Sequence, residues 1–233
     1  MTHGPAGRTG PGVAVPVVDT CCEDCTPATA AHPDERWLRN ARYARWLAWA
    51  SLAWMTAEGI VGLAAGLAAG SIALVGWALG SGIEGLASVI VVWRFTGSRM
   101  LSDTAERRAQ KAVAVSFWLL APYIAIEAIR DLAAHHPASA TLLGIVLTAS
   151  SLVIMPVLGI AKRRLGARLG SGATAGEGTQ NLMCAAQAAG VLLALVVVAL
   201  WPGGWPIDPI IALAIAGWSV WEGHRSWRGA VCC

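Results

Sequence analysis

Six long apolar segments follow one another along the chain, separated by short polar stretches. They cover about residues 44–68, 72–94, 112–133, 139–161, 174–201 and 206–224. A bilayer is spanned by about 20 apolar residues in helical form, so each segment is long enough for one transmembrane helix. Proline near the start of the last segment is compatible with a first helical turn. The pattern therefore predicts an all-α polytopic membrane protein with six transmembrane helices.

The composition and one short connection fit this interpretation. Only 13% of the residues are charged, whereas a soluble domain has about 25%. The first two segments are joined by residues 68–71 alone. So short a connection predicts that these two helices form an antiparallel hairpin.

The basic residues predict the orientation. Arg130 is the one basic residue that falls on the opposite side from the others. The remaining 16 of the 17 are Arg8, Arg36, Arg39, Arg42, Arg45, Arg94, Arg99, Arg107, Arg108, Lys111, Lys162, Arg163, Arg164, Arg168, Arg225 and Arg228. Because cytoplasmic loops are rich in Lys and Arg, we expect both termini in the cytoplasm. The expected location is the plasma (inner) membrane.

The two ends of the chain differ from its middle. Residues 1–35 are rich in Pro, Gly, Ala and Thr without apolar periodicity, so they are predicted to be a disordered cytoplasmic tail. Residues 36–228 would form the six-helix domain and residues 229–233 a short second tail. The tails hold the cysteines Cys21, Cys22, Cys25, Cys232 and Cys233. Cytoplasmic thiols stay reduced, so these five either capture a metal as an accessory site or bind metals only adventitiously.

Three acidic residues fall inside the apolar segments. Glu58, Glu84 and Glu127 each lie about 13 to 15 residues into a segment, which at about 1.5 Å rise per residue is close to mid-depth. An ionised carboxylate there is costly and usually faces a cavity, an ion or a partner. The alternative is a protonated acid hydrogen-bonded between helices. Three acids at one depth favour a shared polar site.

The fifth segment offers two more polar residues on one helix face. Gln180 and Cys184 are four residues apart, the spacing of neighbours on one face of a helix. If the helix begins near Ala173, Cys184 also reaches mid-depth. Gly176 and Gly178 are poor helix formers, and a helix beginning at Asn181 would leave Cys184 near the cytoplasmic edge. Both starts remain open at this point.

Four short motifs resemble the cation diffusion facilitator family of divalent-metal/proton antiporters. Gly70-Ser71-Ile72-Ala73-Leu74 is similar to the family's GS-x-AL start of span two, and Gly80-x-x-x-Glu84 stands at its [HD]-x-x-x-D ligand pair. Gln180-x-x-x-Cys184 stands at the H-x-x-x-D pair of span five, and Asp208-Pro209-x-x-Ala212-Leu213 resembles the DP-x-x-AL entry to span six. The resemblance covers about residues 40–225.

The resemblance implies a metal site at mid-membrane and alternating access around it. Glu84 and Cys184 would be the main ligands, Gln180 a weak one, and Glu58 and Glu127 substitute ligands or proton carriers. Gly80 offers no ligand where the family has one. A cysteine thiolate would favour softer ions such as zinc, cadmium or copper(I). The chain ends about ten residues after the sixth segment, so we expect a divergent member without the soluble domain that usually follows.

The expected function is a secondary transporter that moves a divalent or soft cation, zinc-like, out of the cytoplasm in exchange for protons. The alternative is a membrane metal sensor or partner subunit on the same scaffold. No phosphate-binding glycine loop or nucleophile–base arrangement suggests an enzyme. The expected partners are the lipid bilayer, the metal cation, protons and a second copy of the chain in a homodimer. We expect no nucleic acid and no permanently bound cofactor.

Overall fold

The structure is a computed structural model that describes residues 34–69, 72–135 and 142–229. These residues form six α-helices and two short 3-10 turns. The α-helices are α1 (Glu35–Ala69), α2 (Ile72–Arg94), α3 (Asp103–Ala134), α4 (Leu142–Leu169), α5 (Gly172–Leu200) and α6 (Ile207–Trp227). The 3-10 turns are η1 (Gly97–Leu101) and η2 (Pro202–Gly204). No β-strand occurs in these ranges, so the all-α prediction is confirmed.

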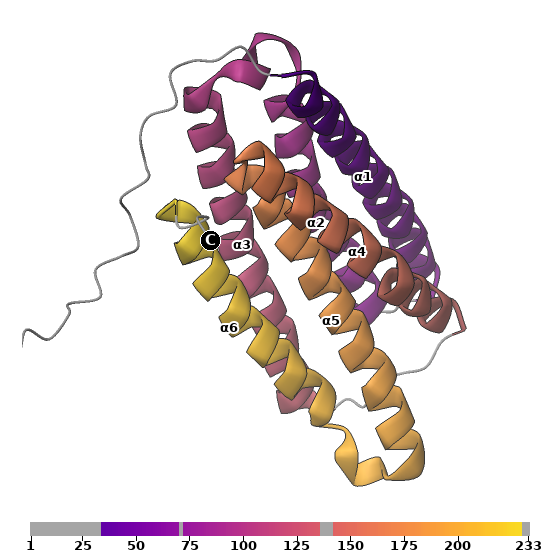
Figure 1. The fold of residues 1–233 in the computed structure, drawn as a ribbon. Helices are drawn as coiled ribbons and strands as arrows, with labels where there is room; N and C mark the ends of the chain where they lie inside the picture. The colour runs from indigo at the N-terminus through magenta and orange to yellow at the C-terminus, as the bar shows by residue number, and fades with distance from the viewer. Residues whose placement is uncertain (1–33, 70–71, 136–141, 230–233) are drawn as a thin grey trace, which may run out of the picture. The chain divides into compact units, whose positions relative to one another are not determined.

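The helices pack as three pairs of neighbours in sequence or space. The most extensive contacts join α4 to α5, α1 to α2 and α3 to α6, as Figure 1 shows. Smaller contacts join α2 to α3, α1 to α4 and α2 to α5. Residues from α1, α2, α4 and α5 can therefore meet between these helices, where the family-like positions lie.

Several helices extend beyond their predicted apolar segments. The first begins at Glu35 rather than near 44, the third at Asp103 rather than near 112, and the fourth ends at Leu169 rather than near 161. The extensions carry the basic residues that were placed in cytoplasmic loops, because long charged side chains are good helix formers. Five helices, α1 to α5, are long and apolar enough to cross a membrane. The shorter α6 completes the bundle by packing on α3.

Glycines allow α4 and α5 to approach closely. A Cβ atom on Gly159 would lie 2.8 Å from the carbonyl oxygen of Gly178, and one on Gly166 would lie 2.7 Å from the backbone nitrogen of Ala175. No side chain fits into such a contact, so only glycine allows this separation. Small residues at helix interfaces are typical of membrane bundles. The close approach places the polar side chains of α5 directly against α4.

Two helices contain an internal proline. Pro122 lies within α3 and Pro156 within α4. Each proline lacks the N–H that would bond to the carbonyl four residues earlier, which locally weakens the helix. Membrane helices tolerate this where neighbouring groups satisfy the backbone. Pro156 directly follows Met155, one of the buried residues that line the site described below.

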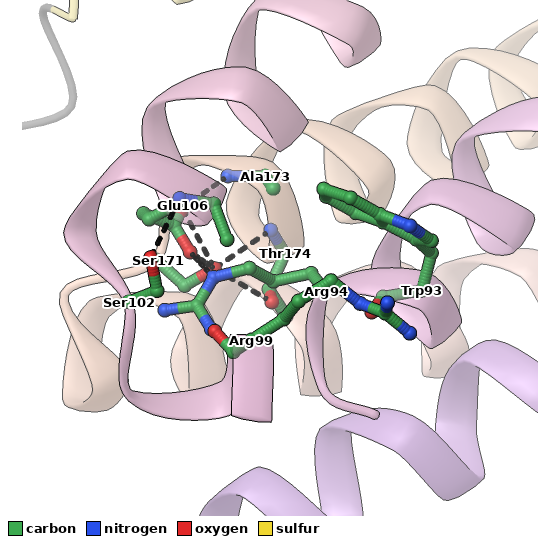
Figure 2. A network of polar contacts seen from close by, with 9 residues as sticks. Trp93, Arg94, Arg99, Ser102, Glu106, Ser171, Ala173 and Thr174 are labelled. Carbon is green, nitrogen blue, oxygen red and sulfur yellow. Dashed lines mark hydrogen bonds and ion pairs between the residues drawn. The ribbon is translucent and has the colours of Figure 1, made fainter. Parts of the chain in front are cut away.

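A network of polar contacts joins the ends of α2, α3 and α5 (Figure 2). Glu106 of α3 accepts hydrogen bonds from Arg94 Nε at 2.6 Å and from the backbone nitrogen of Ala173 at 3.1 Å. Ser171 Oγ donates to Glu106 at 3.1 Å and, as the N-cap of α5, accepts from the backbone nitrogen of Thr174. We call this set the Glu106 network. It fixes the N-terminus of α5, where a carboxylate is also favoured by the helix dipole.

The Glu106 network settles where α5 begins. The helix starts at Gly172, with Ser171 as its cap, so the earlier of the two predicted starts is correct. Cys184 is therefore 12 residues into α5, or about 18 Å along its axis at about 1.5 Å per residue. Gly176 and Gly178 do not interrupt the helix because their missing side chains are used for packing: Gly178 against α4 and Gly176 against Val113 of α3.

Candidate functional site

The centre of the candidate site is a contact between α2 and α5. The thiol of Cys184 on α5 and the carboxylate of Glu84 on α2 lie close enough to interact. Both side chains are buried, with exposed fractions of 6% for Glu84 and 4% for Cys184. The Oε2 atom of Glu84 has no hydrogen-bond partner among the described residues. A buried carboxylate with an unpartnered oxygen is costly unless another group occupies it during function.

Glu58 of α1 adds a second carboxylate to this centre. Its Oε1 atom accepts hydrogen bonds from Ser151 Oγ of α4 at 2.7 Å and from Trp77 Nε1 of α2 at 3.0 Å. Its Oε2 atom has no partner among the described residues. Glu58 is close enough to interact electrostatically with both Glu84 and Cys184. We call Glu58, Glu84 and Cys184 the central cluster.

Two buried methionines pack with the cysteine of the central cluster. Met55 of α1 and Met155 of α4 pack with Cys184 and Ala185 in one buried group, and the exposed fractions of the two methionines are 3% and 0%. The side-chain nitrogen of Asn181 lies 3.4 Å from the Met155 sulfur. These methionines were not predicted from the sequence, because buried methionine is usually only a packing residue. Met55 lies three residues from Glu58, and Met155 lies four residues from Ser151. Each spacing indicates that the two residues share one face of their helix.

The two weak positions of the family-like motifs have other partners. Gly80 faces Tyr123 of α3, whose ring would be 3.3 Å from a Cβ atom at Gly80. The Tyr123 hydroxyl donates to the carbonyl oxygen of Gly76, so the tyrosine occupies the space beside both glycines. Gln180 donates to Ser116 Oγ of α3 at 3.0 Å, while its Oε1 atom has no partner in the described part of the chain.

Glu127 lies outside the central cluster. It forms an ion pair of 3.3 Å with Arg130 one turn along α3, and its side chain is 30% exposed. Its Oε2 atom would be 3.2 Å from a Cβ atom on Gly76, two turns from Glu84. The three acids predicted at one depth thus divide into two buried members and one paired with a basic residue.

The acid and thiol groups alone do not form a closed metal site. Among residues 34–69, 72–135 and 142–229, no group of three or more His, Cys, Asp and Glu side chains could hold a metal ion. Cys21, Cys22, Cys25, Cys232 and Cys233 lie outside the described residues. In the described ranges Cys184 is the free cysteine, and it is buried. A cation bound between α2 and α5 would therefore need additional donors or a different helix arrangement.

A buried ion pair lies on the same helix faces, toward the Glu106 network. Lys162 Nζ of α4 contacts Glu177 Oε1 of α5 at 2.6 Å, with side-chain exposed fractions of 0% and 1%. Lys162 also donates to Ser51 Oγ of α1, which in turn accepts from Asn181 at 3.1 Å. From the sequence, Lys162 was expected in a cytoplasmic loop, and Glu177 was not predicted as a site residue. Their positions in the sequence could have indicated them, because each lies seven residues, or two helical turns, from a residue of the site. Lys162 follows Met155 at this spacing, and Glu177 precedes Cys184.

The comparison with known protein families identifies the chain. The sequence pattern of the cation efflux transmembrane domain matches residues 48–228, from the middle of α1 to the end of α6. The chain belongs to the cation efflux family. It is thus an integral membrane protein and a cation transporter of this family's kind, a class that comprises transporters rather than enzymes. A search of curated proteins found no significant match.

Proposed function

We propose that the chain moves a divalent or soft metal cation out of the cytoplasm in exchange for protons, with Glu84 and Cys184 as its central ligands. The observation that carries this proposal is the buried contact between Glu84 and Cys184, with one Glu84 oxygen left without a hydrogen-bond partner among the described residues. The contact joins α2 and α5, the helices whose motifs resemble the family's ligand pairs. A cation at this point can replace the thiol proton and use the free oxygen.

Proton exchange follows from the chemistry of these ligands. Thiolate and carboxylate bind metals in their deprotonated forms, so metal binding releases protons from them. Carboxylates inside membrane bundles commonly serve as proton carriers for the same reason. Glu58 interacts electrostatically with Glu84 and Cys184, and its hydrogen bond to Ser151 connects the centre to α4. Glu58 is therefore placed to accept a proton or to become an additional ligand when the helices rearrange.

A second function has support from two positions of the site. Tyr123 fills the space beside Gly80, and Gln180 is bonded to Ser116, so two of the four family-like positions do not face a common ion. A membrane sensor or partner subunit could bind the cation at Glu84 and Cys184 without releasing it on the other side. Such a protein would bind metal and show no flux.

The test is metal flux into proteoliposomes, with and without a pH gradient. Zinc, cadmium, manganese, iron and cobalt would be compared for the unmodified chain, Glu84→Gln and Cys184→Ser. Gln retains the volume of Glu84 but cannot carry the charge. We therefore expect flux to fall by at least about 100-fold, as for loss of a central charged group, and its pH dependence to be lost. Cys184→Ser should weaken cadmium transport more than manganese transport, because oxygen is a harder ligand than sulfur.

A matched control removes a carboxylate elsewhere. Glu222 of α6 pairs with Arg225 at 3.4 Å and is remote in sequence from the site helices. Glu222→Gln should leave flux near normal. Near-normal flux in Glu84→Gln would reject the transport mechanism, and metal binding without any flux would favour the sensor or subunit.

The proposed orientation has both termini in the cytoplasm, and the proposed assembly is a homodimer in the plasma (inner) membrane. The excess of Lys and Arg on one side supports the orientation. An impermeant thiol reagent applied to intact cells should not label Cys21 or Cys233. Labelling of either residue would overturn the proposed orientation.

A further inference from the structure

The central cluster is short of ligands if only acids and the thiol are counted, but two methionines pack in one buried group with its cysteine. The described residues hold no site of three or more His, Cys, Asp and Glu ligands. Met55, Met155 and Cys184 pack together from three different helices, α1, α4 and α5. Residues contributed by several helices to one buried point are typical of binding sites in helix bundles.

We propose that Met55, Met155 and Cys184, together with Glu84, form a sulfur-rich centre that selects a soft monovalent cation, copper(I) or silver(I), over zinc. This inference rests on the proposed function, because it names the class of cation that the same centre would carry. It adds two ligands that the family-like motifs do not contain.

The three sulfur-containing residues lie between two polar contacts. Glu58 and Ser151, one turn from Met55 and Met155 respectively, are hydrogen-bonded to each other at 2.7 Å. On the other side, Ser51 and Asn181 are hydrogen-bonded at 3.1 Å. These hydrogen bonds join the helices that carry the three residues, α1 to α4 and α1 to α5.

Two contacts connect this layer to polar atoms. The Asn181 side chain lies 3.4 Å from the Met155 sulfur, so this sulfur lies toward α5, one turn from Cys184. Cys184 itself interacts with Glu84, whose Oε2 atom is buried and without a partner among the described residues. The unpartnered oxygen of a side chain with an exposed fraction of 6% is independent support for a ligand here.

Ligand softness favours a monovalent soft ion. Thioether and thiolate sulfur select copper(I) over harder divalent ions. The two thioethers add soft ligands without adding charge. Zinc prefers four nitrogen, thiolate or carboxylate ligands, and these are too few here.

The test measures binding, so its outcome does not depend on flux. The full chain would carry Cys21, Cys22, Cys25, Cys232 and Cys233 changed to Ser, which leaves Cys184 as the one thiol. Silver(I) and zinc affinities would be measured by competition with chelators in detergent. In Met55→Leu with Met155→Leu, we expect silver affinity to fall at least about tenfold and zinc affinity to change less than about twofold. Leucine conserves the packing volume, so the bundle should remain folded.

Met183 provides the matched control. It is fully buried on α5, next to Cys184 in sequence, but it contacts Ser219 of α6 rather than the sulfur group. Met183→Leu should leave silver affinity unchanged. Equal silver affinity in the double variant and its parent, or an equal loss in Met183→Leu, would overturn the proposal.

X-ray absorption of the silver- or copper(I)-loaded parent provides a measurement that needs no methionine variant. We expect about three sulfur neighbours around the metal, and a shell of oxygen and nitrogen alone would overturn the proposal. The two proposals fail in different ways. Sulfur-dependent silver binding without flux rejects transport but retains the sulfur centre, whereas Glu84-dependent zinc flux with no sulfur shell retains transport and rejects the sulfur centre.

Discussion

Glu106 is a half-buried carboxylate and Glu84 a buried one, and the contacts of the two differ. Both oxygens of Glu106 are occupied, one by Ala173 and Ser171 and the other by Arg94 and Ser171 (Figure 2). Glu84 interacts with the Cys184 thiol, and its Oε2 atom has no hydrogen-bond partner among the described residues. The first acid has a fixed partner of opposite charge, and the second has none.

The difference separates acids that hold helices together from acids that can accept a cargo. A carboxylate with all its hydrogen bonds made within the protein contributes to stability and loses this contribution when it is replaced. A buried carboxylate with an open oxygen costs stability and is retained for another reason. In this chain the first kind joins the helix ends and the second lies among the helix centres.

The Lys162–Glu177 pair is intermediate. Glu177 has a counter-charge at 2.6 Å, as Glu106 has, but its Oε2 atom has no hydrogen-bond partner among the described residues, like that of Glu84. Both side chains are almost completely buried. Replacing one partner of such a pair leaves an uncompensated charge in the interior. Substitutions in this pair therefore give the strongest test of the difference between structural and functional acids.

The largest loss of stability is expected for Lys162→Met. The substitution leaves Glu177 buried without its counter-charge, which should lower the free energy of unfolding by about 3–5 kcal/mol. The measurement is unfolding in mixed micelles titrated with a denaturing detergent. Lys162→Met combined with Glu177→Gln removes both charges and should recover most of the loss, to within about 1–2 kcal/mol of the parent. A double variant as unstable as the single one would show that hydrogen bonds to Ser51, not charge pairing, determine the effect.

A smaller loss is expected for Glu106→Gln, and it should contrast with Glu84→Gln. The glutamine at 106 leaves Arg94 without its counter-charge and weakens the cap of α5, so the free energy of unfolding should fall by about 2–3 kcal/mol. Glu84→Gln should leave it unchanged or slightly raised, because a buried amide costs less than a buried carboxylate. Both variants would be measured by the same micelle titration. Equal losses at the two positions would remove the distinction between structural and functional acids.

Most of the fold could be predicted from the sequence because apolar length decides it. Six helical segments and the short hairpin between α1 and α2 follow from the requirement that membrane helices satisfy their backbone internally. The helix ends could not be predicted as well. Lys162 and Arg94 were assigned to loops because isolated basic residues rarely lie in the interior, and their partners Glu177 and Glu106 are 15 and 12 residues away in sequence.

The candidate site was predictable only in part. Glu58, Glu84 and Cys184 were identifiable because a polar residue in an apolar segment stands out, and the structure brings these three together. Glu127 has the same pattern but pairs with Arg130 on its own helix, which mid-depth position alone does not reveal. Met55 and Met155 could not be predicted as site residues, because an apolar residue does not differ from its neighbours in an apolar segment. Only the packing of the folded bundle groups these residues, from α1 and α4, with Cys184 of α5.

The smallest effect is expected from removing the N-terminal segment. Residues 1–30 show no apolar periodicity, so their deletion removes no core contact. We expect the free energy of unfolding in mixed micelles to stay within about 0.5 kcal/mol of the parent, as for changes outside packed regions. Transport should weaken only at low metal concentration, where capture by Cys21, Cys22 and Cys25 would increase the supply of metal to the centre. The matched control keeps the segment and changes these three cysteines to Ser, which should reproduce the same loss at low metal concentration. A deletion that prevents insertion, or that lowers flux at every metal concentration, would show that the segment contributes to the membrane domain itself.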